Sequence, residues 1–215
     1  MDFNRIYEYR FKDVDKHKKL ITWSEISNFI FKELKQPQII IDPAAGECEF
    51  INSIPSREKW AVDLNIDFIS KYANDDVKVK IGDSLKLDLP SDYFDAVFIS
   101  NFLEHLNSHE EIHLLLKNMF NTLHVGGRIA VMGPNFKYCQ KEYFDFADHK
   151  MILTHSSLEE HLYGAGFNII KVVPRFLPVS FRGRLPINKL TVRTYLTFPL
   201  LWKFFGKQFL LIAEK

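Results

Sequence analysis

The segment IIIDPAAGECEF, residues 39–50, determines how the rest of the chain is interpreted. Three isoleucines run into Asp42, as in a buried parallel strand, and a turn of small residues around Gly46 follows. Small residues let the backbone approach a ligand closely, and the start of the next helix offers free N–H groups. The segment therefore predicts a strand–turn–helix unit with a ligand at the carboxyl end of the strand. Many α/β proteins share this pattern, so the residues that follow decide its meaning.

Outward from this unit, strand-like and helix-like runs alternate, which predicts a mostly parallel sheet with helices on both faces. Strands are expected at 39–42, 60–63, 77–81, 96–100, 128–132, 169–173 and 209–213. Apolar residues at helical spacing predict helices at 21–34, 109–123 and 157–164. Ser108 and Ser156 are each followed three residues later by a glutamate, the spacing of a capping box that begins a helix. Gly164 or Gly166 is expected to end the last helix.

The chain of 215 residues has the length of one domain, and 1–215 is expected to fold as a single unit. Residues 1–36 are expected to form a helical cap. A stretch rich in proline, aromatic and basic residues, 174–206, precedes the last strand as an insertion, which suggests a hairpin-like arrangement at the sheet edge. Cys48 and Cys139 lie far apart in no metal or redox spacing, which favours a reduced, cytoplasmic protein.

Acidic residues recur at the ends of the strands that flank the glycine turn. Asp63 ends the second expected strand, where a carboxylate can accept hydrogen bonds from both hydroxyls of a ribose. Asp83 follows the third strand, where it can accept from an exocyclic adenine amine, and Asp95 opens the fourth strand. In open α/β sheets, ligands bind in the crevice at the carboxyl edge. Asp42, Asp63, Asp83 and Asp95 in this order therefore predict a nucleoside-binding site there.

With these blocks the chain resembles the class I methyltransferases that use S-adenosylmethionine (SAM), over nearly its full length. In that family a strand ending in Asp continues as G-x-G-x-[FL]. DPAAGECEF aligns with this pattern, with Ala44 and Cys48 in place of two glycines. Further blocks match in AVDLN, GDSLKLDLP, FDAVFISNFLEHL and LHVGGRIAVMGPN. The resemblance implies a Rossmann-like α/β fold with a seven-stranded, mostly parallel sheet in the order 3-2-1-4-5-7-6, whose last strand, FLLIAEK, is antiparallel.

The resemblance also implies SAM as cofactor and S-adenosylhomocysteine as product. It places these residues around the cofactor: Asp42, Ala44, Gly46, Asp63, Leu64, Asp83, Ser84, Ser100 and Asn101. The segments YEYRF, PNFKY, YFDFADHK, PRFLP and GKQFLLIAEK narrow the likeness to a type 11-like bacterial subgroup found with surface-polysaccharide and glycan biosynthesis. The expected reaction is therefore O-methylation of an anionic small molecule or of a sugar or glycan precursor, phosphorylated or linked to a nucleotide or lipid.

Two histidines are candidate general bases at the rim of the sheet. His105 follows the fourth strand, and histidine titrates near neutral pH. A structural histidine that supports the cofactor loop is an equally good interpretation of His105. Asp148 precedes His149, and an aspartate beside a histidine can orient the ring and raise its basicity. His149 is thus a second candidate base, with closure of the acceptor pocket as the alternative.

The spacing of three histidines bears on metal binding. His105, His109 and His113 are four residues apart, a spacing that can serve a metal, but Ser108 caps a helix between the first two. No metal is therefore expected. At the amino terminus, four residues are candidates for a lid over the cofactor, with an ordinary docked helix as the alternative: Tyr7, Tyr9, Arg10 and Phe11.

The carboxyl-terminal quarter has an unbalanced charge. No acidic residue lies between His161 and Ala213, whereas eight lysines and arginines do. Guanidinium forks suit phosphate or carboxylate groups, so Arg175 and Arg182, with Tyr138 and Tyr143, are expected to contact the acceptor. The segment YLTFPLLWKFFG is too short to span a bilayer; a peripheral membrane contact at the inner face, a homodimer interface and plain core packing all fit it.

Three competing functions are weaker matches. Nucleic acid is not expected as a partner, because the loop SNFLEH lacks the [ND]-P-P-[YF] pattern of enzymes that methylate nucleobase amines. A nicotinamide-dependent oxidoreductase would share the strand, glycine turn and ribose acid, but AAGECE does not supply G-x-G-x-x-G. A non-catalytic, regulatory subunit with the SAM-binding fold is the third alternative, against which the intact acids argue.

Overall fold

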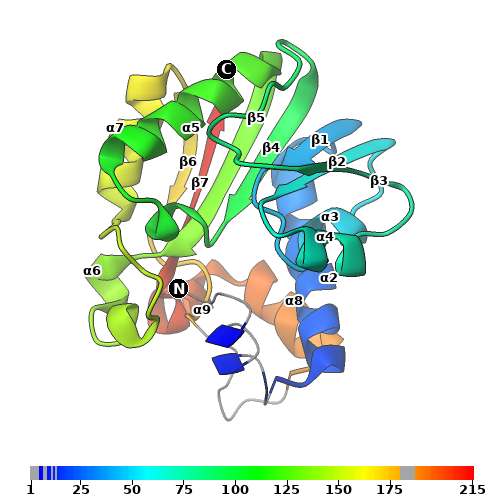
Figure 1. The fold of residues 1–215 in the computed structure, drawn as a ribbon. Helices are drawn as coiled ribbons and strands as arrows, with labels where there is room; N and C mark the ends of the chain where they lie inside the picture. The colour runs from blue at the N-terminus through cyan, green and yellow to red at the C-terminus, as the bar shows by residue number, and fades with distance from the viewer. Residues whose placement is uncertain (1–4, 7–8, 11, 13, 180–186) are drawn as a thin grey trace.

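One seven-stranded sheet forms the centre of the protein. The computed structural model describes residues 5–6, 9–10, 12, 14–179 and 187–215. The strand order is β3-β2-β1-β4-β5-β7-β6, with β1 to β5 parallel and β7 antiparallel to β5 and β6 (Figure 1). The strands are β1 (Ile39–Asp42), β2 (Glu58–Asp63), β3 (Val77–Ile81), β4 (Phe94–Ser100), β5 (Leu123–Pro134), β6 (Asn168–Val173) and β7 (Gln208–Glu214). The predicted Rossmann-like fold, strand order and antiparallel last strand are confirmed.

Helices cover both faces of this sheet. The cluster of buried residues on one face draws on α2 (Lys16–Glu33), α3 (Glu49–Ser53) and α4 (Ile66–Tyr72), together with α8 (Lys189–Thr197) and α9 (Pro199–Phe205). The cluster on the opposite face draws on α5 (His109–Thr122) and α7 (His155–Ala165). Short elements follow β4 and β5 at the carboxyl edge: η1 (Leu103–His105), α6 (Phe136–Cys139) and η2 (Tyr143–Asp145).

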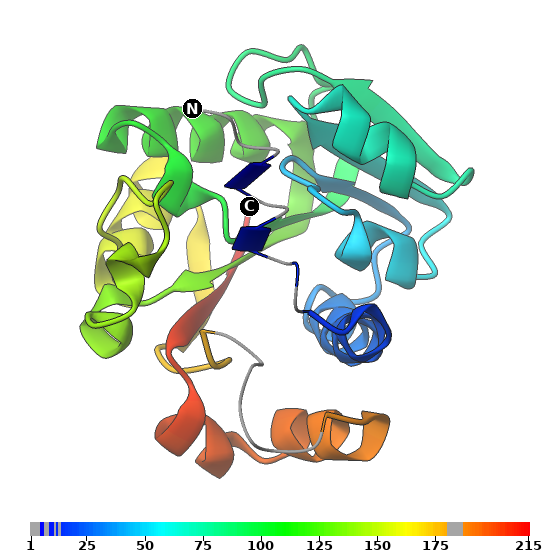
Figure 2. The same cartoon turned by 60° about the horizontal axis from the view of Figure 1, so that its bottom comes forward.

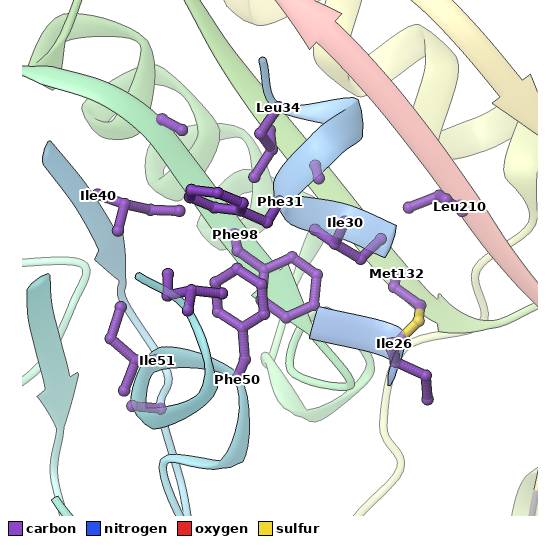
Figure 3. Packing of buried hydrophobic residues seen from close by; sticks show 14 of the residues in the cluster. Ile26, Ile30, Phe31, Leu34, Ile40, Phe50, Ile51, Phe98, Met132 and Leu210 are labelled. Carbon is purple, nitrogen blue, oxygen red and sulfur yellow. The ribbon is translucent and has the colours of Figure 1, made fainter. Parts of the chain in front are cut away.

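Strand residues alternate between the two cores. Phe98 of β4 points toward α2 and α3, where its ring centroid lies 4.0 Å from that of Phe50 (Figure 3). Ile26 and Ile30, one turn apart on α2, close this cluster. Val97 belongs to the cluster on the α5 side. Burial on both faces holds the parallel strands rigidly, so their carboxyl ends form one fixed edge on which loops can carry function.

The structure corrects the predicted starts of β5 and α7. Strand β5 begins at Leu123 rather than at 128, because Leu123 pairs with Phe94 before a register shift in β4. Helix α7 begins at His155, capped by Thr154 rather than by Ser156. Thr154 and Ser157 exchange side chain–backbone hydrogen bonds, which satisfies two free N–H groups and fixes the earlier start. Gly166, at φ +107°, ends this helix.

The insertion forms a helical cap beyond the carboxyl edge. Helices α8 and α9 lie together there, beside the start of β7 (Figures 1 and 2). Strands β6 and β7, which flank the insertion, pair as an antiparallel hairpin. The predicted amino-terminal cap contains α2, capped by Asp15, which packs against α3 and α8. Within the described ranges, no helix combines the length and apolarity needed to cross a membrane.

Candidate active site

The turn after β1 leaves open space at Gly46. Asp42 ends β1, and its Oδ1 accepts a hydrogen bond from the Ala44 N–H at 3.1 Å. Gly46 has φ +51°, a conformation that favours glycine, and a Cβ added there would meet no atom within 4 Å. The Gly46 N–H donates to Asp63 Oδ2 at 2.9 Å, which joins this turn to the end of β2. Backbone is therefore exposed at the place where the resemblance puts the cofactor.

Carboxylates at the ends of three strands are held in the same way. Asp42 accepts from the N–H two residues on, as Asp63 Oδ1 accepts from Asn65 N at 2.8 Å and Asp83 Oδ1 from Leu85 N at 3.0 Å. Each is an Asx-type turn, in which the side chain and the following backbone fix one another. Every carboxylate keeps further lone pairs for a ligand. The set provides hydrogen-bond acceptors suited to ribose hydroxyls and an amine.

Two neighbouring predicted residues differ in exposure. Leu64, which follows Asp63, has 70% of its surface exposed and offers an apolar contact. Ser84 is buried, and its hydroxyl donates to the carbonyl of Pro43. The placement of Ser84 at the cofactor stays a prediction, although its hydroxyl is already bonded within the chain. That group links the β1 and β3 loops.

Burial dominates the electrostatics under the glycine turn. Burial, with Asp63 and Glu49 nearby, raises the pKa of Asp42 to about 7. Burial alone would lower the pKa of Lys19. The carboxylates of Glu49 and Glu47, which both bond to Lys19, raise this pKa above its usual value. Burial, with Asp42 nearby, raises the pKa of the Cys48 thiol to about 12, so Cys48 is a neutral packing residue.

Cys48 takes the place of a family glycine in a glycine-like conformation. It has φ +58° and caps the start of α3 without a side-chain hydrogen bond. Left-handed backbone at a non-glycine residue is strained, which explains why a glycine would suit this position. The strain is offset by complete burial of the side chain.

The end of β4 supplies two more predicted residues. Asn101 has φ +48°, its N–H donates to the Met132 carbonyl at 2.9 Å, and its Nδ2 lies 3.4 Å from the hydroxyl of Ser100. Both residues lie at the carboxyl edge. Asp95 does not, because it opens β4 at the opposite edge and accepts from the N–H groups of Gln38 and Ile39. Its predicted place among the site acids is wrong.

Across the edge, Asp148 pairs with His105 and Arg10. His105 Nδ1 lies 3.0 Å from the carbonyl oxygen of Asp148 and 3.6 Å from its Oδ2, while Arg10 donates to Oδ1. Asp148 is 2% exposed. Burial opposes ionisation, but the Arg10 hydrogen bond and the nearby His105 hold the pKa of Asp148 below its usual range. Of the predicted lid residues, Tyr7 and Phe11 lie outside the described residues, whereas Arg10 is tied to Asp148 at the carboxyl edge.

His149 has surroundings unlike those predicted. Its ring packs against Phe146 and Tyr143, each at 4.9 Å between centroids, and its Nδ1 is buried without a hydrogen-bond partner. Burial, with His105 nearby, lowers the pKa of His149 to about 4. The predicted Asp148–His149 pair is therefore wrong. Asp148 orients His105, and the basicity of His149 is lowered rather than raised.

Glu104 was not predicted from the sequence and lies inside this cluster. Its side chain is 2% exposed, and burial raises its pKa. Ligand atoms of Glu104, His105 and His149 all lie within 4.8 Å of one another, so these three could hold a cation. His109 does not join them; its Nδ1 lies 2.9 Å from Nε2 of His161 on α7. The only sequence signal for Glu104 is that it adjoins His105.

The predicted acceptor residues serve mainly to hold the structure. Tyr143 is 1% exposed, and its hydroxyl bonds to backbone of the 151–153 segment. Arg175 donates to the carbonyls of Gly206 and Phe204 at the end of α9 and stacks over the ring of Tyr138. Backbone groups bond to the Tyr143 hydroxyl and to two nitrogens of Arg175, and the contacts of both residues with an acceptor stay predictions. Arg182 lies outside the described residues.

Beside Tyr138 there is a basic groove of about 330 Å³. Lys137, Lys141 and Lys207 line it with Tyr138, Gln140 and Glu142. Lys207 is paired with Glu142. Among the described residues, the ammonium groups of Lys137 and Lys141 have no hydrogen-bond or ion-pair partner. The groove therefore carries excess positive charge and suits an anion.

Comparison with known proteins places this geometry in context. Residues 41–131 match a family model described as a methyltransferase domain. No curated protein sequence matches the chain. A crystal structure of a SAM-dependent methyltransferase from Archaeoglobus fulgidus is 21% identical, with all of both chains covered and a TM-score of 0.71.

Two further structures share the fold. A SAM-dependent methyltransferase from Clostridium acetobutylicum is 15% identical and covers 99% of this chain and 97% of its own, with a TM-score of 0.66. Human N-acetylserotonin methyltransferase, solved in complex with SAM, is 14% identical, with 89% of this chain and 51% of its own covered and a TM-score of 0.60. At these identities the likeness is one of fold, and the fold is that of SAM-dependent methyltransferases.

Proposed function

We propose that this chain is a methyltransferase that transfers the methyl group of SAM to an oxygen of an anionic small molecule or of a sugar or glycan precursor. The observation that carries this is the trio of Asx-turn carboxylates, Asp42, Asp63 and Asp83, around the open space at Gly46. The match of 41–131 to a methyltransferase domain supports it.

The residues present suit SAM. The two oxygens of Asp63 can accept from ribose hydroxyls, Asp83 from the adenine amine, and the exposed side chain of Leu64 can cover one face of the base. SAM supplies an electrophilic methyl group on a sulfonium. The chain's own work is then to align the acceptor and to take up its proton.

His105 is the proposed proton acceptor. Its Nδ1 faces the carbonyl and carboxylate of Asp148, which favours the tautomer with the proton on Nδ1 and leaves Nε2 free to accept. With SAM held at Asp63 and Asp83, the cofactor would supply the methyl group, and His105 Nε2 would take up the proton of the acceptor hydroxyl. Asp148 is a positioning residue for His105, and Arg10 positions Asp148. His149 packs beside His105 at 5.2 Å between ring centroids.

An anionic acceptor is supported by the groove at Lys137, Lys141 and Lys207. Ammonium groups attract phosphate or carboxylate, and the two without described partners lose no existing ion pair when an anion arrives. The groove lies where β5 gives way to α6, at the carboxyl edge shared with the candidate site.

The cofactor is tested by isothermal titration with SAM, S-adenosylhomocysteine and NADPH. We expect micromolar binding of the first two and at least about 100-fold weaker binding by Asp63→Ala. Asp75→Ala, which removes an exposed acid from the same half of the sheet, is the matched control. Tighter binding of NADPH than of SAM would contradict the proposal and favour a nicotinamide-dependent oxidoreductase.

The acceptor is tested by transfer of a labelled methyl group to phosphorylated or nucleotide-linked sugars and to the same sugars without phosphate. We expect transfer to the charged set, with KM raised about tenfold or more in Lys137→Ala/Lys141→Ala. SAM binding without transfer to any acceptor would instead favour a regulatory subunit.

A further inference from the structure

The helical cap exposes several large apolar side chains. Five large apolar side chains of α8, α9 and their junction have about half or more of their surface exposed: Leu190 (73%), Phe198 (57%), Leu200 (64%), Phe204 (69%) and Phe205 (49%). We call these five the cap face. Monomeric proteins rarely gather so many large apolar groups on one exposed element, and such patches usually mark an interaction surface.

Packing of the cap does not require these side chains. The two helices are anchored by their inward residues Val192, Leu196 and Trp202. The Trp202 ring meets Phe176 at 5.1 Å and Phe29 at 5.9 Å, and its Nε1 donates to the Tyr195 carbonyl. The cap face is therefore an excess of apolar surface on a helix pair that is already docked.

Charge around the cap face is positive. Lys189 and Arg193 of α8 share the single carboxylate of Glu25, and Lys203 of α9 is exposed with no partner among the described residues. No acidic residue occurs between His161 and Ala213. Exposed aromatic and leucine side chains next to lysine and arginine form the pattern of elements that lie in the interface of an anionic membrane.

The positive charge around the cap face distinguishes between two candidate partners, an anionic membrane and a second copy of the chain. A two-fold dimer places the same patch against itself, so two positively charged cap faces would repel each other. An anionic bilayer attracts the same charges while its acyl boundary accepts the apolar side chains. The positive charge thus favours lipid over self-association.

We propose that the cap face docks this protein on the surface of an anionic lipid bilayer. Helix α9 has seven residues, so it lies on the surface and does not span it. The cap sits beyond the carboxyl edge of the sheet (Figures 1 and 2), so docking brings the candidate active site near the membrane surface. The inference does not rest on the proposed function, since lipid binding needs no methyl transfer.

Vesicle co-sedimentation of the full chain tests this proposal. We expect binding to phosphatidylcholine vesicles that contain phosphatidylglycerol, and at least about tenfold weaker binding to phosphatidylcholine alone. Phe204→Ser/Phe205→Ser should weaken binding about tenfold or more, because the apolar contact is lost. Lys203→Glu should weaken it severalfold and leave a smaller dependence on salt. The control is Val125→Ser, which removes a side chain 83% exposed on the opposite edge of the sheet.

Each variant is first checked by its thermal unfolding and by its SAM affinity, which should equal those of the unchanged chain because these side chains are exposed. Equal binding by wild type and Phe204→Ser/Phe205→Ser would overturn the proposal, as would no binding to anionic vesicles. A dimer in light scattering that this double variant abolishes would assign the cap face to a second copy and equally overturn it.

Discussion

The two halves of the carboxyl edge are held in different ways. In the cofactor half, Asp42, Asp63 and Asp83 each bond to backbone two residues further on. In the half to which we assign the acceptor, and which we call the acceptor half, His105 and Asp148 are 43 positions apart, and Arg10 reaches Asp148 across 138. The first half therefore forms wherever its strands form, whereas the second is complete only after distant segments have docked. Local geometry builds one half and tertiary contacts build the other.

This difference has a consequence for ligand binding. Because each Asx turn forms within the end of its own strand, we expect the turns to be preorganised for SAM without the Arg10–Asp148 pair. The acceptor half, by contrast, depends on the Arg10–Asp148 pair to hold His105. Changes at the amino terminus should thus affect methyl transfer more than cofactor binding.

The largest effect is expected from Asp42→Asn. With the pKa of Asp42 raised to about 7, the folded chain keeps a proton that the unfolded chain loses near pH 4. Stability therefore falls as pH rises from about 4 to about 7, by about 4 kcal/mol at roughly 1.4 kcal/mol per pKa unit. The amide keeps the hydrogen bond to Ala44 without this penalty. Urea unfolding at pH 4, 6 and 8 should show the variant gaining on wild type as pH rises; a constant difference would contradict the assignment.

Arg10→Ala should come next. It leaves the Asp148 carboxylate, 2% exposed, without its cation, and breaking a buried ion pair costs about 3 kcal/mol. Adding Asp148→Asn should restore part of this loss. Lys18→Ala, which breaks the exposed Lys18–Asp15 pair, should leave the unfolding temperature nearly unchanged. Thermal unfolding measures all three, and SAM affinity within about threefold of wild type in Arg10→Ala would separate the two halves.

Two glycines in similar surroundings provide a test of where the cofactor binds. Gly46 and Gly126 both have positive φ, and a Cβ on either meets nothing within 4 Å. Alanine should therefore cost about 1 kcal/mol of stability at each position. Only Gly46→Ala puts a methyl group where SAM must lie, so its SAM affinity should fall about 100-fold, roughly 2.7 kcal/mol. Equal SAM affinity in the two variants would exclude the space at Gly46 as the cofactor site.

Sequence reasoning succeeded where a residue's role follows from its own strand. Alternation of strands and helices, with the family blocks, led to the sheet order, and Asp42, Asp63 and Asp83 could be assigned to one edge because parallel strands end together. Asp95 shows the limit of that argument. It belongs to the same strand set but begins its strand, and therefore faces the other edge.

The acceptor half could not be predicted because adjacency in sequence is a poor guide within a turn. Asp148 and His149 are neighbours whose side chains leave the backbone in different directions, one to Arg10 and the other to Tyr143. Arg175 suggested an anion site, yet helix α9 ends beside it and offers two carbonyls. Both outcomes depend on where remote elements pack, which no local pattern records.

The smallest effect is expected from replacing His149. This replacement distinguishes a packing role of the ring from a catalytic one. The unfolded chain binds a proton at this histidine below pH 6.5, whereas the folded chain binds it only below about pH 4. Stability therefore falls as pH falls through that window. Because the ring is only partly buried, the loss is about 1–2 kcal/mol after allowance for solvent screening. His149→Phe keeps the ring contacts with Phe146 and Tyr143 and should abolish that loss in urea unfolding.

The exposed residue His113 provides the control, because His113→Phe leaves His149 in place and with it the low-pH loss. If His105 is the proton acceptor, His149→Phe should keep methyl transfer within about tenfold of wild type, whereas His105→Gln should lower kcat about 100-fold or more. The reverse ranking would move the base to His149. It would also show that the histidine with the lowered pKa, rather than the one oriented by Asp148, defines the acceptor half.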